Sequence, residues 1–233
     1  MPVDLRPPFP PDFRLFLASQ SPRRHSLLRD MGVPYEVVRS VADEVMSGDT
    51  AVTLAATNAV AKVRGAALPA GVPLGAFVLG TDTLVTLGDR VMGKPGSRDD
   101  ARDMITALSG RTHQVVSGVA LMRLGSPGAP EGAPGATVPS GGAGQMGGAA
   151  TGLIVATAVT DVTFGELSAA QVEAYLASGE WTDKAGAYGI QGLAGMFATE
   201  VRGEYSNVVG LPLCLLARLF REAGFDLMRR QWI

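Results

Sequence analysis

The sequence has few of the residues that form disulfide frameworks or zinc sites. Its 233 residues include one cysteine, Cys214, and two histidines, His25 and His113. A single cysteine cannot form an internal disulfide, which fits a reducing cytosol, and the apolar stretch from Leu211 to Leu219 predicts a buried, unreactive thiol. The histidines lack ligand spacing, so zinc is not expected. We expect His25 on a helix surface and His113 in a structural hydrogen bond.

Excess charge of one sign and long apolar runs are also absent. The formal net charge is -2, which excludes a broad positive surface for nucleic acid, so any positive site must be local. No window approaches the roughly 18 apolar residues of a membrane span. The proline-rich segment from Pro2 to Pro11 does not resemble a signal peptide. We therefore expect a cytoplasmic protein with no nucleic-acid or membrane partner.

Lysine is rare as well. Of the 20 lysines and arginines, only Lys62, Lys94 and Lys184 are lysine. Because a compact ammonium and a planar guanidinium are not interchangeable, each lysine is a candidate for a specific role.

Strand and helix patterns alternate along the chain. Apolar runs and turn residues predict strands at 13–18, 35–38, 77–87, 90–92, 115–124, 153–164 and 196–201. Caps and periodicity predict helices at 22–31, 50–68, 97–109, 168–177 and 213–223. This alternation predicts an α/β fold, with 1–12 as a proline-rich extension and 13–233 as one domain in two lobes. Half of residues 125–152 are glycine or proline, which predicts a flexible insertion at a hairpin tip.

A short basic stretch, Ser19-Gln20-Ser21-Pro22-Arg23-Arg24, joins the first strand to the first helix. Ser21 fits the N-cap and Pro22 the first helical position. Unpaired N–H groups and the positive end of the helix dipole attract anions there. The hydroxyls of Ser19 and Ser21 and the guanidiniums of Arg23 and Arg24 would complete a phosphate site. The alternative is an ordinary capped helix whose arginines face solvent.

Asp82 lies inside the apolar run 77–87. An ionised carboxylate there is costly unless it is paired, bound to a metal or exposed at a strand end. A Mg²⁺ ion or a water awaiting activation would account for it. The alternative is a structural aspartate bonded to backbone amides. Lys94 follows the adjacent hairpin and is expected near the same end of the strands, unless it is a solvated turn lysine.

Two further segments carry candidate ligands. Asp43 and Glu44 form a carboxylate pair that either is solvated or helps to hold a hard divalent cation. In the glycine-rich loop 183–192, the groups able to contact a ligand are Lys184, Tyr188 and Gln191. A glutamine amide presents a donor and an acceptor, which matches the O4 and N3–H edge of uracil or thymine. A purely structural loop is the alternative.

Together these segments resemble the Maf-like nucleoside triphosphate pyrophosphatases. The motifs are LASQSPRR, GTDTLV, MGKP, ALSGRTHQVVSGVAL, VTDVTF, SGEWTDKAGAYGIQG and YSNVVGLPL, in the order of the family, and they span nearly all of 15–224. The departures are the N-terminal extension, the insertion at 125–152, Thr81 and Val63. None of them removes a charged site residue.

The resemblance implies a two-lobed Maf/ITPase-like α/β fold with a central mixed sheet and a cleft between the lobes. It implies hydrolysis of a nucleoside triphosphate to the monophosphate and pyrophosphate. Asp82 would be the proton acceptor, and Asp82 with Glu44, helped by Asp43, would bind Mg²⁺ or Mn²⁺. The residues implied to bind the nucleotide or select it are Ser19, Arg23, Arg24, Lys62, Thr83, Lys94, Lys184 and Gln191.

Within the family, KAGAYGIQG is similar to the branch that acts on dTTP and UTP, so modified pyrimidine nucleotides are also candidate substrates. The resemblance makes a homodimer plausible. The alternative function is a nucleotide-binding regulator of septum formation or cell division without turnover. A nucleic-acid-binding module is disfavoured, because interleaved aromatic residues are absent.

Overall fold

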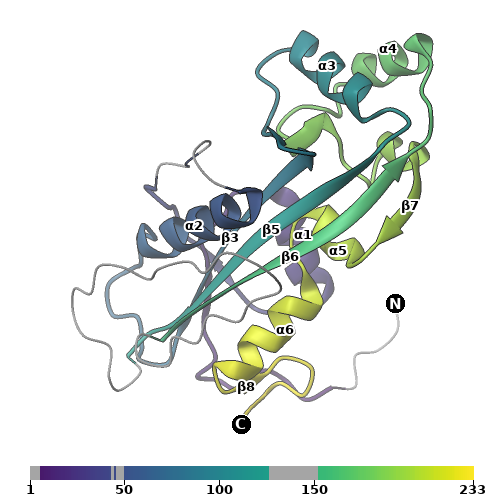
Figure 1. Ribbon diagram of the computed structural model, residues 1–233. Coiled ribbons are helices and arrows are strands. Elements are labelled where there is room, and N and C mark those ends of the chain that lie inside the picture. The colour runs from purple at the N-terminus through teal and green to yellow at the C-terminus, as the bar shows by residue number, and fades with distance from the viewer. Residues whose placement is uncertain (1–5, 43–44, 46–49, 126–151) are drawn as a thin grey trace.

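A mixed seven-stranded sheet forms the centre of the protein (Figure 1). The computed structural model describes residues 6–42, 45, 50–125 and 152–233. The strands are β1 (Leu15–Leu17), β2 (Glu36–Val37), β3 (Phe77–Leu87), β4 (Arg90–Met92), β5 (Thr112–Arg123), β6 (Leu153–Phe164) and β7 (Ala198–Arg202). Their order is β2-β1-β3-β5-β6-β7, with β4 paired to β3. β1 is parallel to β2 and β3, and the other pairs are antiparallel. The predicted α/β fold with a central mixed sheet is confirmed.

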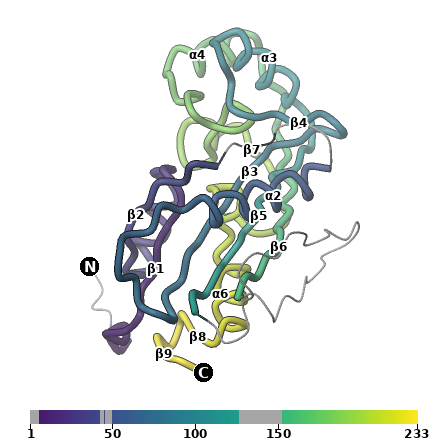
Figure 2. Tube along the Cα trace, turned by 90° about the vertical axis from the view of Figure 1, so that its left-hand side faces the viewer, coloured from purple at the N-terminus to yellow at the C-terminus, as the bar shows by residue number. Residues whose placement is uncertain are grey.

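The helices cover both faces and one end of this sheet. They are α1 (Pro22–Asp30), α2 (Ala51–Arg64), α3 (Arg98–Leu108), α4 (Ala169–Ser178), α5 (Tyr205–Val209) and α6 (Leu213–Glu222), with 3-10 turns η1 (Ala185–Ala187) and η2 (Leu193–Met196). A separate hairpin, β8 (Phe225–Asp226) and β9 (Gln231–Trp232), ends the chain. α2 lies on one face of the sheet and α6 on the other, while α3 and α4 form the end far from the C-terminus (Figure 1). Figure 2 shows β1 and β2 beside β3 at one edge.

Side-chain caps start α2, α3 and α4, whereas α1, α5 and α6 have none. The hydroxyls of Thr50 and Ser97 accept hydrogen bonds from the backbone N–H groups at the starts of α2 and α3, and Ser168 forms a capping box with Gln171. Ser21 has the N-cap position of α1, but its side chain makes no capping bond. Its backbone N–H instead donates to the Ser19 hydroxyl at 3.3 Å. The first turn of α1 is therefore open to other acceptors.

Two hydrophobic clusters share the long strands β3, β5 and β6. The first contains Leu79 and packs against α6, and the second contains Val85 and packs against α3 and α4. Polar residues Asp82 and Thr83 lie in β3 between these two apolar segments. The polar residues of β3 therefore lie where the strand passes from one apolar cluster to the other.

Two glycines let α2 lie directly on the sheet. A Cβ at Gly80 would lie 2.5 Å from the Ala59 carbonyl oxygen, and a Cβ at Gly118 would lie 2.1 Å from that of Ala55. Gly80 is two residues from Asp82 and so shares its face of the strand, while Gly118 is the register partner of Asp82 on β5. This close approach brings the side chains of α2 to Asp82.

Two expectations about single side chains are wrong. Cys214 is exposed because it does not lie on the buried face of α6. Its backbone N–H donates to the Glu204 carboxylate at 2.6 Å. Charge on Glu204 raises the pKa of the Cys214 thiol. His25 is half-buried rather than at a free surface, and its ring nitrogens contact the Tyr35 hydroxyl and the Ser19 carbonyl, each at 3.1 Å. No helix among the described residues is long and apolar enough to cross a membrane.

Candidate active site

A cleft of about 1120 Å³ opens where the polar part of β3 meets α1, α2 and the loop before η2. Nine predicted site residues line it: Ser19, Arg23, Arg24, Lys62, Asp82, Thr83, Lys94, Lys184 and Gln191. They come from segments between residues 19 and 191, which only the fold brings together. Their shared position is an observation, whereas their roles toward a substrate stay predictions.

Asp82 is held on both carboxylate oxygens by α2. It is 6% exposed. The Lys62 ammonium lies 2.7 Å from Oδ1, and the Asn58 amide nitrogen donates to Oδ2 at 2.9 Å. Lys62 also donates to the Thr81 carbonyl at 3.4 Å. The compensation that a carboxylate in this run requires therefore comes from side chains rather than from backbone amides.

The sequence reasoning missed Asn58. It is 1% exposed and lies on α2, which is otherwise rich in alanine and other apolar residues. Asn58 and Lys62 are four residues apart and therefore occupy adjacent turns on one face of the helix. A side-chain amide one turn before a rare lysine was the signal available in the sequence.

The buried guanidinium of Arg24 hydrogen-bonds to three separate segments of the chain. Its Nε donates to the Gly210 carbonyl at 2.9 Å, and its terminal nitrogens donate to the hydroxyls of Ser19 at 2.9 Å and Thr83 at 3.1 Å. The Thr83 hydroxyl also lies 2.8 Å from that of Ser117. Arg24 is 8% exposed, so it is not the solvent-facing arginine of an ordinary capped helix. The planar guanidinium spans the floor of the cleft as a lysine could not.

Arg23 and Lys184 form a positive rim on the cleft. Burial lowers the pKa of the Arg23 guanidinium, an effect that Asp183 opposes. Burial and then the charge of Arg23 lower the pKa of Lys184, while Glu180 and Asp183 act in the opposite direction. Lys184 donates to the carbonyls of Glu180 and Thr182. Two partly desolvated cations that repel each other would gain from an anion placed beside them.

The loop before η2 is held to the sheet on its inner side. Gly186 has φ of 65°, a Cβ there would lie 2.9 Å from Val85 side-chain atoms, and its N–H donates to the Gly93 carbonyl at 3.0 Å. The Tyr188 hydroxyl lies 2.8 Å from Nε2 of His113. The structural hydrogen bond predicted for His113 is confirmed, and burial lowers its pKa to about 4. The loop thus carries Lys184 and Gln191 on an anchored backbone.

The predicted metal ligands are only partly visible. Asp43 and Glu44 lie outside the described residues, as does nearly all of the predicted insertion at 125–152. Ser40 and Ala42, which precede the pair, line the cleft. No group of three His, Cys, Asp or Glu side chains that could hold a metal occurs in the part of the chain that the structure describes. Asp82 is the predicted metal ligand that can be placed.

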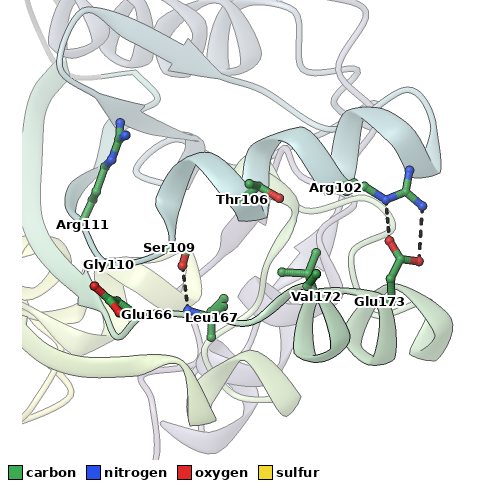
Figure 3. A pocket seen from close by; sticks show the side chains of 10 residues that line it. Arg102, Thr106, Ser109, Gly110, Arg111, Glu166, Leu167, Val172 and Glu173 are labelled. Atoms are coloured by element: carbon green, nitrogen blue, oxygen red, sulfur yellow. Dashed lines mark hydrogen bonds and ion pairs between the residues drawn. The ribbon is translucent and has the colours of Figure 1, made fainter.

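A second hollow of about 470 Å³ lies between α3 and α4 (Figure 3). Two of the charged residues that line it are paired at the surface: Glu173 accepts from Nε of Arg102 at 2.5 Å, and also from Arg98 at 3.1 Å. The Ser109 hydroxyl accepts from the Leu167 backbone N–H at 2.7 Å (Figure 3). None of the sequence-predicted site residues lines this hollow, so we place the candidate site in the larger cleft.

Comparisons with known proteins identify the family of this chain. Three curated bacterial relatives carry the name dTTP/UTP pyrophosphatase. The relative from Anaeromyxobacter dehalogenans is 41% identical over 92% of this chain and 96% of its own length. Those from Chromobacterium violaceum (40%) and Moorella thermoacetica (41%) cover 93% of this chain and 98% of their own lengths. The model of the family described as Maf-like protein matches residues 14–223. The chain therefore belongs to the Maf family.

Proposed function

We propose that this protein is a nucleoside triphosphate pyrophosphatase that hydrolyses dTTP and UTP to the monophosphate and pyrophosphate. The observation that carries the proposal is the buried Asp82 carboxylate in a cleft lined by cations from distant segments. The names of the relatives support the same substrates and favour an enzyme over a regulator that binds without turnover. A protein that only binds nucleotides has no need of a costly carboxylate beside phosphates.

In the proposed reaction, water attacks the α-phosphorus while the bond to the bridging oxygen of the β-phosphate breaks. Asp82 accepts the proton of the attacking water. Lys62 and Asn58 keep its carboxylate in one orientation. Negative charge builds on the leaving pyrophosphate, and the fixed cations Arg23, Lys94 and Lys184 stabilise that charge without reorganising. Arg24 and Ser19 shape the phosphate site at the start of α1.

A divalent cation, Mg²⁺ or Mn²⁺, fits this donor set. Each oxygen of Asp82 accepts one hydrogen bond and has a second lone pair. Mg²⁺ is commonly held by one or two carboxylates together with substrate phosphates. Asp82 would hold it, and we propose Glu44 as the second ligand, with Asp43 helping. When bound, the ion would neutralise charge on the phosphates and the leaving group.

We assign choice of the base to Gln191, with Arg23 and Thr83 contributing. Gln191 is exposed on the anchored loop and lines the cleft. Its amide matches the O4 and N3–H edge of uracil and thymine. Pyrimidines modified at carbon 5 keep this edge, so they are candidate substrates too.

Pyrophosphate release from dTTP, UTP, 5-methyl-UTP, CTP and 7-methyl-GTP, with and without Mg²⁺, tests the proposal. We expect metal-dependent release from dTTP and UTP. Asp82→Asn should lower kcat by at least roughly a hundredfold, the usual scale for loss of a general base. Retained activity in Asp82→Asn would remove the proposed role of the carboxylate. A wild-type protein that binds dTTP but releases no pyrophosphate would favour the regulator.

A further inference from the structure

One helix controls the orientation of the Asp82 carboxylate. Lys62 donates to Oδ1 at 2.7 Å and Asn58 to Oδ2 at 2.9 Å, from adjacent turns of α2. With both oxygens bonded, rotation of the carboxyl group about its last torsion would break one bond or the other. A terminal torsion of this type is broad when nothing constrains it. The second bond therefore determines where the remaining lone pairs point, and Asn58 supplies it.

The same amide group of Asn58 also fixes a neighbouring backbone segment. Its Oδ1 accepts from the Val45 N–H at 2.8 Å, and its Nδ2 donates to the Val45 carbonyl at 3.0 Å. The two protons of Nδ2 are thus divided between Val45 and Asp82. All three bonds are made by a side chain that is 1% exposed, where an unmade bond is expensive. The amide can donate to Asp82 only in the orientation that also makes both of its hydrogen bonds to Val45.

We propose that Asn58 is a positioning residue for the reaction, which acts through Asp82 by presenting a hydrogen-bond donor to Oδ2. Held this way, the carboxylate meets the attacking water in one orientation. Loss of the donor should lower kcat and leave KM for dTTP near the wild-type value, because Asn58 does not itself line the cleft. The inference rests on the proposed function.

Two near-isosteric substitutions separate this role from a purely structural one. Asn58→Leu removes every hydrogen bond of the side chain. Asn58→Asp keeps an acceptor for the Val45 N–H but replaces the donor facing Asp82 with a second carboxyl oxygen. If Asn58 acts through Asp82, Asn58→Leu should lower kcat about tenfold and Asn58→Asp closer to a hundredfold, the range found for residues that orient catalytic ligands. If Asn58 only holds Val45, the order reverses, because Asn58→Asp preserves more of that contact. The reversed order would overturn the proposal.

A double-mutant cycle supplies a second readout. In the Asp82→Asn background, the additional kcat loss from Asn58→Leu should shrink to less than about twofold, because the group through which it acts is gone. The full additional loss in that background would also overturn the proposal. Asn58→Ser, which is too short to reach both partners, replaces Asn58→Leu in the cycle if the latter does not fold, and the same shrinkage is expected.

Leu54→Ala is the matched control for stability. Leu54 is buried on α2 one turn before Asn58 and packs against Leu84 and Val116. This variant should melt at a lower temperature and keep its kcat. If Asn58→Leu and Asn58→Asp keep wild-type kcat, the positioning role is wrong while the proposed function stands. Absence of activity in the wild type would instead remove the proposed function.

Discussion

The cleft and the hollow between α3 and α4 are both rich in charge, yet they differ in how that charge is held. In the cleft, the side chains of Lys62 and Asp82 are 13% and 8% exposed. At the hollow, the side chains of Arg98 and Glu173 are 50% and 46% exposed. An exposed ion pair gives up hydration for its partner and gains little free energy. Desolvated charges are stable only when their partners are placed with the right geometry. Charge alone does not identify a site; desolvated charge with convergent partners does.

The two regions also differ in the sequence distance that they join. The cleft brings together residues from Ala18 to Gly210, and both Arg24 and Thr83 donate to the Gly210 carbonyl. The hollow is formed by α3, α4 and the residues adjoining them. Arg98, Arg102 and Glu173 pair with one another beside the hollow, whereas at the rim of the cleft burial and then the like charge of Arg23 lower the pKa of Lys184. An anionic ligand would relieve that repulsion, which favours the cleft as the binding site.

The largest difference between the regions should appear on removal of a cation. Lys62→Met leaves the buried Asp82 carboxylate without its ammonium partner and should lower kcat/KM for dTTP by roughly a hundredfold or more. Arg98→Met removes a cation beside the hollow and should leave kcat/KM unchanged. Steady-state pyrophosphate release measures both. Equal losses in the two variants would mean that the regions are equivalent, against our assignment.

Next in size is a pH effect from the histidine behind the cleft loop. Burial lowers the pKa of His113 to about 4, below its value of about 6.5 in an unfolded chain. Between these values only the unfolded chain binds the proton, so stability is complete above pH 6.5 and falls as the pH drops toward 4. The free energy of unfolding should decrease by roughly 2 kcal/mol from pH 7 to pH 5 on this account. Urea titrations at both pH values should show the decrease in wild type and in His25→Gln. His113→Gln should flatten it, and an undiminished slope would argue against His113 as its source.

A smaller effect is expected from the residue assigned to reading the base. Gln191→Glu places a second acceptor against O4 of the pyrimidine and should weaken UTP and dTTP binding about tenfold. Gln171→Glu is the matched change on α4, and it keeps a side chain suited to the capping box. Calorimetric titration with a non-hydrolysable UTP analogue compares the two. Unchanged affinity in Gln191→Glu would remove the base-reading role.

The smallest effect should follow loss of the surface pair at the hollow. Glu173→Gln removes the negative charge and one of the two acceptor oxygens that face Arg102 and Arg98, whose side chains are 37% and 50% exposed. Because such pairs are screened and mobile, we expect no measurable change in melting temperature or in kcat. A clear loss of activity would mean that the hollow is coupled to the cleft, against the assignment of function to the cleft alone.

The sequence by itself determined the long strands, most of the helices and the kinds of chemistry, whereas α5 and the β8–β9 hairpin were not predicted. Caps at Thr50, Ser97 and Ser168, the long apolar runs, and the position of Asp82 in one of them are local signals. Capping and side-chain periodicity act within a few residues, so they can be read from a short stretch of chain. The ordered motifs likewise indicate the family from the sequence alone.

The tertiary structure decided which neighbours those residues have. It buried Arg24 under the Gly210 carbonyl, placed Asn58 between Val45 and Asp82, and turned Cys214 outward. None of these follows from the sequence pattern, because each depends on contacts between segments far apart in the chain or on which face of a helix finds a partner. The packing of α2 onto two glycines of the sheet brings Asn58 and Lys62 to the carboxylate, and a close approach of this kind is determined by the whole fold rather than by any one stretch of it.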